Sequence, residues 1–269
     1  MRFNLVRLKI RFSHRTTRPA NKFMENIKIK NSAGKSIFAV VHYSQIKSDN
    51  LAILCPGYLD SKDYKHLVGL AESLNKRGYT VVGFDPTGTW ESEGDIFDYT
   101  TTQYLEDIKS VLEYMLQQAD YKYILLGGHS RGGTVSILYA ARDPRISLVL
   151  GIMSGSPRRQ KDEEWRKSGF KISQRDLPDN KNEKGEFRVP YSHAEDMDKY
   201  NVLEDVRKVM VPIVLVAGEL DTVVPPADVK EIFDNANEPK KLIEISNIGH
   251  DYRHTQGEIE LVNKIILEA

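Results

Sequence analysis

The sequence predicts an α/β fold in which a mostly parallel sheet is covered by helices on both faces. Three observations support this prediction. Strand-like and helix-like segments alternate from Glu25 onward, the strand-like segments are almost continuously apolar, and turn residues separate them. Continuous apolar runs are typical of parallel strands, because such strands are buried on both faces. The length of 269 residues is enough for one large domain.

The N-terminal half supplies the first of these elements. Strand-like runs occupy residues 37–41, 51–55 and 79–84. Residues 65–76 are expected to form a helix that ends at Arg77-Gly78, because glycine is a frequent stop residue. Residues 102–118 carry apolar side chains at helical spacing, which predicts a helix with one face against the sheet. The remaining expected elements are strands at 123–127, 147–153, 212–217 and 241–245 and helices at 133–141, 229–235 and 257–267.

Composition argues against several classes of protein. Lys and Arg number 38, as do Asp and Glu, so no overall charge favours nucleic acid or an anionic membrane. The longest apolar run, residues 146–153, is too short to span a membrane. The single cysteine, Cys55, excludes an internal disulfide and ends an apolar run, which indicates a buried thiol. No metal or organic cofactor is expected, because the sequence holds no His-Glu-x-x-His, Cys-x-x-Cys or Gly-x-Gly-x-x-Gly motif.

The first 23 residues differ from the rest of the chain. They hold seven Lys or Arg residues and no acidic residue. An organellar transit peptide has such a composition, and the alternation of apolar and basic residues over 5–12 would also suit an edge strand. We favour a third interpretation, in which translation starts at Met24, where the domain-like sequence begins. A cytoplasmic location is therefore expected, with organellar targeting left open.

The segment Gly128-His129-Ser130-Arg131-Gly132 lies between a strand-like and a helix-like run. A Gly-x-Ser-x-Gly pattern in that context predicts a nucleophile elbow. The turn is so tight that the serine takes a strained backbone conformation and the two glycines leave room for neighbouring elements. The turn exposes the serine hydroxyl above the sheet, so Ser130 is the candidate nucleophile.

A serine hydroxyl needs a general base, and the base needs an acid that orients it. His250 follows the last expected strand, and Asp221 follows the strand before it. Parallel strands end at the same side of a sheet, so both residues are expected near Ser130. His254 is the alternative base, and Glu219 is the alternative acid.

Two backbone N–H groups are needed to stabilise a tetrahedral oxyanion. The amide of Arg131 follows the nucleophile directly. The second donor is expected from Cys55-Pro56-Gly57-Tyr58, after an early strand. Pro56 has no N–H, so Gly57 or Tyr58 must donate, and Tyr58 is favoured.

Residues 156–209 interrupt the alternation of strands and helices. This segment is rich in charges of both signs and is too long for an ordinary loop. We interpret it as a lid inserted into a core formed by residues 24–155 and 210–269. A solvated surface loop is the alternative. Its aromatic residues, which are candidates for substrate contact, are Trp165, Phe170, Phe187 and Tyr191.

These motifs together resemble the α/β-hydrolase superfamily from Glu25 to the C-terminus. The segment that starts at Phe84 resembles the family's Asp-x-x-Gly-x-Gly-x-Ser turn, with Thr89 where glycine is usual. Pro56 stands where many relatives carry histidine. Within the superfamily, the likeness is greatest to bacterial serine esterases of the cinnamoyl or feruloyl type, which carry a similar lid. The resemblance implies an α/β-hydrolase fold with a lid between late strands and a triad of Ser130, Asp221 and His250.

The leading hypothesis is a serine carboxylesterase that acts through an acyl-enzyme on small or aryl esters, including hydroxycinnamate esters. The alternatives within the fold are a small-peptide aminopeptidase, an acylglycerol lipase and a thioesterase. An aminopeptidase needs carboxylates for the substrate amine, and Glu195-Asp196-Met197-Asp198 offers them. The alternative from another class is a non-catalytic binding module. The expected partner is a small-molecule ester, without nucleic acid or a membrane span, and a homodimer is left open.

Overall fold

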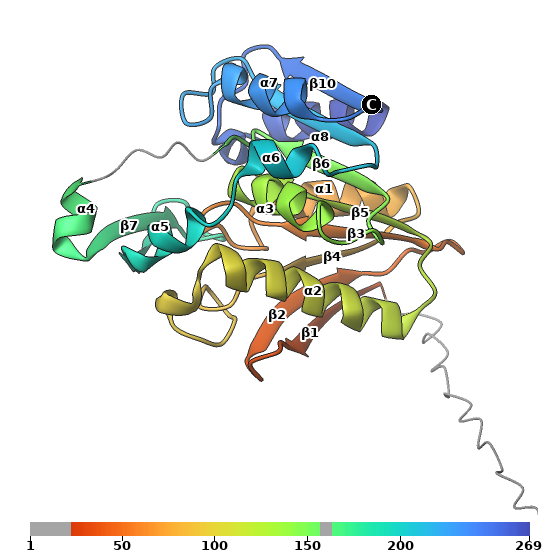
Figure 1. The fold of residues 1–269 in the computed structure, drawn as a ribbon. Coiled ribbons are helices and arrows are strands. Elements are labelled where there is room, and N and C mark those ends of the chain that lie inside the picture. The colour runs from red at the N-terminus through yellow and green to blue at the C-terminus, as the bar shows by residue number, and fades with distance from the viewer. Residues whose placement is uncertain (1–22, 157–162) are drawn as a thin grey trace, which may run out of the picture.

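The computed structural model describes residues 23–156 and 163–269. Its main sheet has eight strands in the order β1-β2-β4-β3-β5-β6-β9-β10 (Figure 1). The two pairs that involve β2 are antiparallel, and all other neighbours in this sheet are parallel. The mostly parallel sheet is therefore confirmed. The strands are β1 (Met24–Lys30), β2 (Ser36–His42), β3 (Asn50–Cys55), β4 (Thr80–Phe84), β5 (Tyr123–His129), β6 (Leu148–Ile152), β9 (Ile213–Gly218) and β10 (Lys240–Ile245).

Helices cover both faces of this sheet, as the sequence predicts. Side chains along β3 alternate between two cores, so that Ile53 faces one and Leu54 the other. Leu112 of α2 and Val135 of α3 are buried in the first core, and Leu74 of α1 is buried in the second. These helices are α1 (Lys65–Lys76), α2 (Thr101–Gln118), α3 (Arg131–Ala140), α7 (Pro226–Asn235) and α8 (Gln256–Glu268), with short 3-10 helices η1 (Ile96–Asp98) and η2 (Tyr252–His254).

The helix α1 ends where the sequence predicts its end. Gly78 has a φ of +90°, and the amide of Tyr79 donates to the carbonyl of Leu74. A residue without a side chain takes this conformation without strain, which explains the stop signal. The sequence analysis does not predict the edge strand β1, because its exposed polar residues alternate with half-buried or buried ones and form no continuous apolar run.

The segment between β6 and β9 contains short elements that the sequence analysis did not identify. They are α4 (Glu163–Ser168), β7 (Phe170–Asp176), β8 (Lys184–Pro190), α5 (Ser192–Met197) and α6 (Val202–Val206). β7 and β8 form an antiparallel hairpin separate from the main sheet. Figure 1 shows α4, β7 and α5 beside the core rather than within its layers. Most side chains of this hairpin are exposed or half-buried, so it lacks the apolar pattern of a core strand.

Among the described residues, the first strand starts at Met24. Residues 1–22 of the basic segment, which include 5–12, lie outside the described residues. In the described part of the chain, no helix combines the length and the apolar character needed to cross a membrane.

Candidate active site

Ser130 lies in the tight turn between β5 and α3. Its φ is +52°, a strained value for a residue with a side chain, and its amide donates to the carbonyl of Ile152 at 2.8 Å. A Cβ atom on Gly128 would lie 2.1 Å from the Cys55 carbonyl oxygen, and one on Gly132 would lie 2.0 Å from the same oxygen. The backbone at the end of β3 therefore requires both glycines, as expected for an elbow.

The structure brings Ser130, His250 and Asp221 together in one hydrogen-bonded chain. His250 Nε2 lies 3.0 Å from Ser130 Oγ, and His250 Nδ1 lies 2.7 Å from Asp221 Oδ2. The other carboxylate oxygen of Asp221 accepts from the amides of Val223 and Val224, both at 2.8 Å. Asp221 is buried, so these donors hold its carboxylate in one orientation. The arrangement suits proton transfer from the serine hydroxyl to the imidazole.

The two alternative residues point elsewhere. Glu219 is exposed and its Oε2 accepts from the amide of Asn247 at 2.9 Å, so it supports the loop before His250. His254 lies in η2, where its Nδ1 is 3.9 Å from Asp176 Oδ2. Neither side chain takes the position that Asp221 or His250 holds beside Ser130.

The loop after β3 places Tyr58 beside the nucleophile. Arg131 is the first residue of α3, so its amide has no acceptor within the helix. Both Tyr58 and Arg131 line the cavity that contains Ser130. A Cβ atom on Gly57 would lie 2.4 Å from Asp60 Oδ2, so a larger residue there would displace the Asp60 side chain. Tyr58 and Arg131, whose amides are the predicted oxyanion donors, thus both lie at the cavity that contains Ser130.

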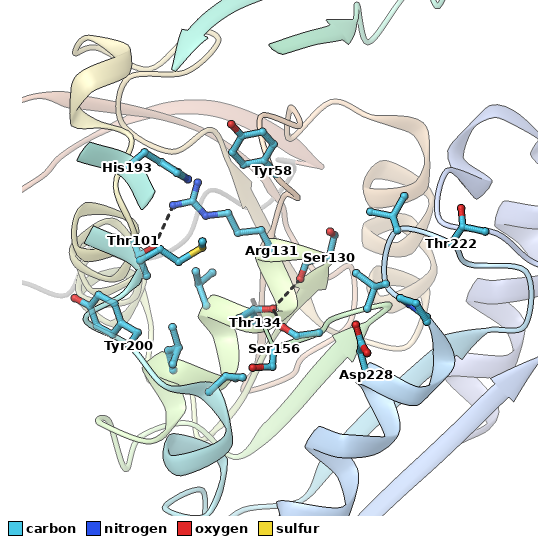
Figure 2. A pocket seen from close by; sticks show the side chains of 18 of the residues that line it. Tyr58, Thr101, Ser130, Arg131, Thr134, Ser156, His193, Tyr200, Thr222 and Asp228 are labelled. Atoms are coloured by element: carbon cyan, nitrogen blue, oxygen red, sulfur yellow. Dashed lines mark hydrogen bonds between the residues drawn. The ribbon is translucent and has the colours of Figure 1, made fainter. Parts of the chain in front are cut away.

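A cavity of about 530 Å³ opens beside Ser130 (Figure 2). The core contributes Thr134, Val135 and Leu138 from α3 and a loop after β9. The segment between β6 and β9 contributes further residues of the wall. Its described lining residues are Gly155, Ser156, Trp165, Lys171, His193, Met197, Tyr200 and Val202. The inserted segment therefore contributes directly to the candidate substrate site.

The four lid aromatics have different environments. Trp165 is buried and lines the cavity, and its Nε1 donates to the Val189 carbonyl at 3.1 Å. Tyr191 packs against the Trp165 ring at 5.6 Å between centroids. Phe187 packs against Trp90, and the guanidinium of Arg188 lies over the Phe170 ring. The structure brings only Trp165 of the four to the cavity wall.

Sequence reasoning missed two polar groups of this wall. It assigned Arg131 for its amide alone, whereas the guanidinium also lines the cavity. His193 is buried, and its Nδ1–H donates to the Tyr99 carbonyl at 2.7 Å. Burial, reinforced by the charge of Arg131, lowers the pKa of His193 to about 3, so this imidazole is neutral near pH 7. No sequence signal marked His193, because its contacts join segments distant along the chain.

Among residues 23–156 and 163–269, two clusters of potential metal ligands lie outside the cavity. Asp63, Asp85 and Glu91 surround Lys62, whose Nζ lies 2.7, 3.1 and 2.5 Å from their carboxylates, so a lysine already supplies the cation there. Asp60, His66 and His129 form the second cluster.

In the second cluster, Asp60 Oδ1 lies 3.4 Å from Arg175 Nε. Burial lowers the pKa of both His66 and His129. Cys55, expected from the sequence to be a buried thiol, is fully buried, and burial raises the pKa of its thiol to about 12.

The profile of the family described as "Serine aminopeptidase, S33" matches residues 47–201. The chain belongs to this family. It is a hydrolase with the α/β-hydrolase fold, which confirms the fold class predicted from the sequence.

Among curated proteins, the chain is similar to the mitochondrial palmitoyl-protein thioesterase of Rattus norvegicus, with 25% identity over 190 residues. The match covers 68% of this chain and 63% of the rat protein. This chain is also similar to the structure of Est1E from Butyrivibrio proteoclasticus with ferulic acid bound. The TM-score is 0.72 and the sequence identity is 23%. It covers 90% of this chain and 96% of Est1E. DcsB in complex with its substrate analogue gives a TM-score of 0.75 at 21% identity, covering 91% of this chain and 98% of DcsB.

Proposed function

We propose that this hydrolase cleaves small or aryl carboxylic esters through a covalent acyl-enzyme on Ser130. The observation that carries this proposal is the hydrogen-bonded chain from Ser130 Oγ through His250 to Asp221, with distances of 3.0 and 2.7 Å. A serine, an imidazole and a buried carboxylate in this arrangement activate a hydroxyl for attack on a carbonyl carbon.

In the first half of the reaction, Ser130 Oγ attacks the ester carbonyl while His250 Nε2 takes the hydroxyl proton. The tetrahedral oxyanion accepts hydrogen bonds from the amides of Tyr58 and Arg131. Collapse of the intermediate breaks the bond to the alcohol oxygen, which receives the proton from His250. Asp221 keeps the Nδ1–H of His250 in place and stabilises the imidazolium. In the second half, water repeats the attack with His250 as the base, and Ser130 recovers its proton.

The cavity and its lid support a substrate with a short or flat acyl group, including hydroxycinnamates. Its volume of about 530 Å³ lies within the range of small-molecule sites, and Trp165 provides a flat apolar wall. The likeness to Est1E with ferulic acid bound is compatible with this assignment, but at 23% identity it shows only that the two proteins share a fold.

A thioesterase is the second candidate. The curated relative from Rattus norvegicus is a palmitoyl-protein thioesterase, and the same nucleophile and oxyanion donors serve esters and thioesters. An aminopeptidase is less favoured. Of Glu195-Asp196-Met197-Asp198 only Met197 lines the cavity, and Asp196 accepts hydrogen bonds from Thr102 and Lys199 instead. We also propose a cytoplasmic location, although the rat relative is named as mitochondrial.

Labelling with a fluorophosphonate, combined with turnover of matched nitrophenyl esters and thioesters, tests the proposal. Wild-type protein should be labelled on Ser130 and should release nitrophenol. Ser130→Ala should lose both activities while its thermal unfolding remains cooperative, because the variant loses only the attacking oxygen. Wild-type protein that neither labels nor turns over any ester or thioester would support a non-catalytic binding module instead.

A further inference from the structure

The guanidinium of Arg131 forms part of the cavity wall beside the nucleophile. Its Cζ lies 4.2 Å from the centroid of the Tyr99 ring, and its Nη2 donates to Thr101 Oγ1 at 3.4 Å. Nη1 is buried without a hydrogen-bond partner. Figure 2 shows the side chain extending from Ser130 toward His193 and Thr101. The residue after the nucleophile therefore directs a positive charge along one side of the substrate cavity.

This charge has no acidic partner in residues 23–156 and 163–269. No carboxylate oxygen there lies within 4.0 Å of the Arg131 guanidinium. The one acidic side chain among the described lining residues is Asp228, and Figure 2 shows it on the other side of Ser130. A guanidinium that is largely removed from water without a counter-charge is costly, so a ligand that supplies the counter-charge would be strongly favoured.

A second cation belongs to the same part of the wall. Lys171 of β7 lines the cavity, and its Nζ lies 3.9 Å from the Trp165 ring and 5.4 Å from the Tyr58 ring. Arg131 Cζ lies 6.0 Å from that same Tyr58 ring, so both cations flank one aromatic side chain. His193, which is near both cations, is neutral near pH 7, because its pKa is lowered to about 3. Arg131 therefore places on this wall a guanidinium that has no acidic partner among the described residues, with the Lys171 ammonium nearby.

We propose that the substrate carries a carboxylate and that Arg131 and Lys171 bind this carboxylate while Ser130 attacks the ester or thioester group. This inference rests on the proposed function and specifies its substrate class as half-esters or half-thioesters of dicarboxylic acids, or esters whose alcohol part is acidic. Arginine suits this role because its planar donors match a carboxylate, and the aromatic surroundings restrict its motion.

Pairs of substrates that differ only in charge test the inference. The first pair is nitrophenyl hydrogen adipate and its methyl ester, which place the charge in the acyl part. The second pair is 4-acetoxybenzoate and 4-acetoxybenzamide, which place it in the alcohol part. Wild-type protein should prefer the anionic member of one pair by at least about 30-fold in kcat/KM, the scale expected for a desolvated charge pair. The preferred pair identifies the half of the substrate that carries the carboxylate.

Variants assign the preference to the two side chains. Arg131→Gln and Lys171→Met should each lower the anionic-to-neutral ratio about tenfold or more, and Arg131→Lys should retain part of it. Lys181→Met removes a lysine from the exposed turn between β7 and β8 and should leave the ratio unchanged. The ratio corrects for any loss of activity that both substrates share, including disturbance of the Arg131 amide.

A binding measurement separates this inference from the proposed function. Adipate should raise the melting temperature of the Ser130→Ala protein, whereas dimethyl adipate should not. When Arg131→Gln is added to the Ser130→Ala variant, the shift caused by adipate should disappear. An active wild-type enzyme that hydrolyses neutral and anionic esters equally would overturn the inference and leave the proposed function intact. If the enzyme is inactive but adipate still raises the melting temperature, the proposed function fails and the anion site stands.

Discussion

The Nε–H of Arg175 in β7 donates a hydrogen bond to the carbonyl of Tyr58 at 2.9 Å. The inserted hairpin therefore holds the loop whose amide is the proposed second oxyanion donor, and 117 residues separate the two partners in sequence. This relationship gives the hairpin a positioning role in addition to its place at the cavity.

Arg175→Met should lower kcat by about 10- to 100-fold with a smaller change in KM, because the Tyr58 loop loses a contact that fixes the oxyanion donor. The measurement is steady-state hydrolysis of a nitrophenyl ester. Arg188→Met is the matched control on the facing strand, where the guanidinium lies over the Phe170 ring. Equal kinetics for the two variants would show that the Tyr58 loop keeps its geometry without the hairpin.

The choice of general base is tested by a pair of histidine variants. His250→Ala should reduce turnover by several orders of magnitude, since Ser130 then lacks the base at 3.0 Å. His254→Ala should have a small effect, because that side chain lies near Asp176. Cooperative thermal unfolding of the inactive variant distinguishes a lost base from a misfolded protein. A larger loss for His254→Ala would reassign the base.

The acid is tested in the same way. Asp221→Asn keeps the size of the side chain but removes the charge that orients His250, and a loss of about ten-thousand-fold in kcat is expected from the serine-protease template. Glu219→Gln should act weakly through the Asn247 loop. If Glu219→Gln matched the loss of Asp221→Asn, the charge of Glu219 would have to contribute to the chemistry.

The size of the acyl group that the cavity accepts should depend on Trp165. Trp165→Ala enlarges the cavity and should shift the kcat/KM ranking of nitrophenyl esters from short and aryl groups toward longer chains. Phe187→Ala removes a lid aromatic that packs on Trp90 outside the cavity wall and should preserve the ranking. An unchanged ranking for Trp165→Ala would place selectivity elsewhere in the cavity.

The buried imidazole of His66 should make the protein sensitive to acid. In the described structure neither ring nitrogen has a hydrogen-bond partner, and burial together with the nearby His129 and Arg253 holds its pKa well below 6.5. The unfolded chain protonates this histidine near pH 6.5, whereas the folded chain does not, so the free energy of unfolding falls as pH decreases below about 6.5.

His66→Phe removes this proton uptake. Between pH 7 and pH 5, the free energy of unfolding of the variant should therefore fall by about 2 kcal/mol less than that of the wild-type protein. Urea unfolding of both proteins at the two pH values measures the difference. Parallel losses in the wild-type and the variant would show that other groups cause the acid sensitivity.

The sequence by itself determined the strands of the main sheet other than β1, the helices α1, α2, α3, α7 and α8, and the elbow. Each depends on local pattern: apolar runs of strand length, apolar residues at helical spacing, and a glycine where φ is positive, as at Gly78. Ser130, Asp221 and His250 could be selected before the structure because they follow separate strands that end on one side of the sheet. That rule predicts that the three residues lie near one another, and it does not depend on contacts between their side chains.

Only the tertiary structure decided how the inserted segment meets this site. The hairpin β7–β8 lacks a core pattern because its exposed and half-buried residues alternate, and its contacts with Tyr58 and Asp60 join distant segments. The same reason explains Arg131. Its sequence position predicts an amide at a helix start, but the direction and burial of its guanidinium depend on Tyr99 and Thr101, which come from elsewhere in the chain. Local pattern determines which element forms, whereas the environment of a charged side chain depends on the segments that fold around it.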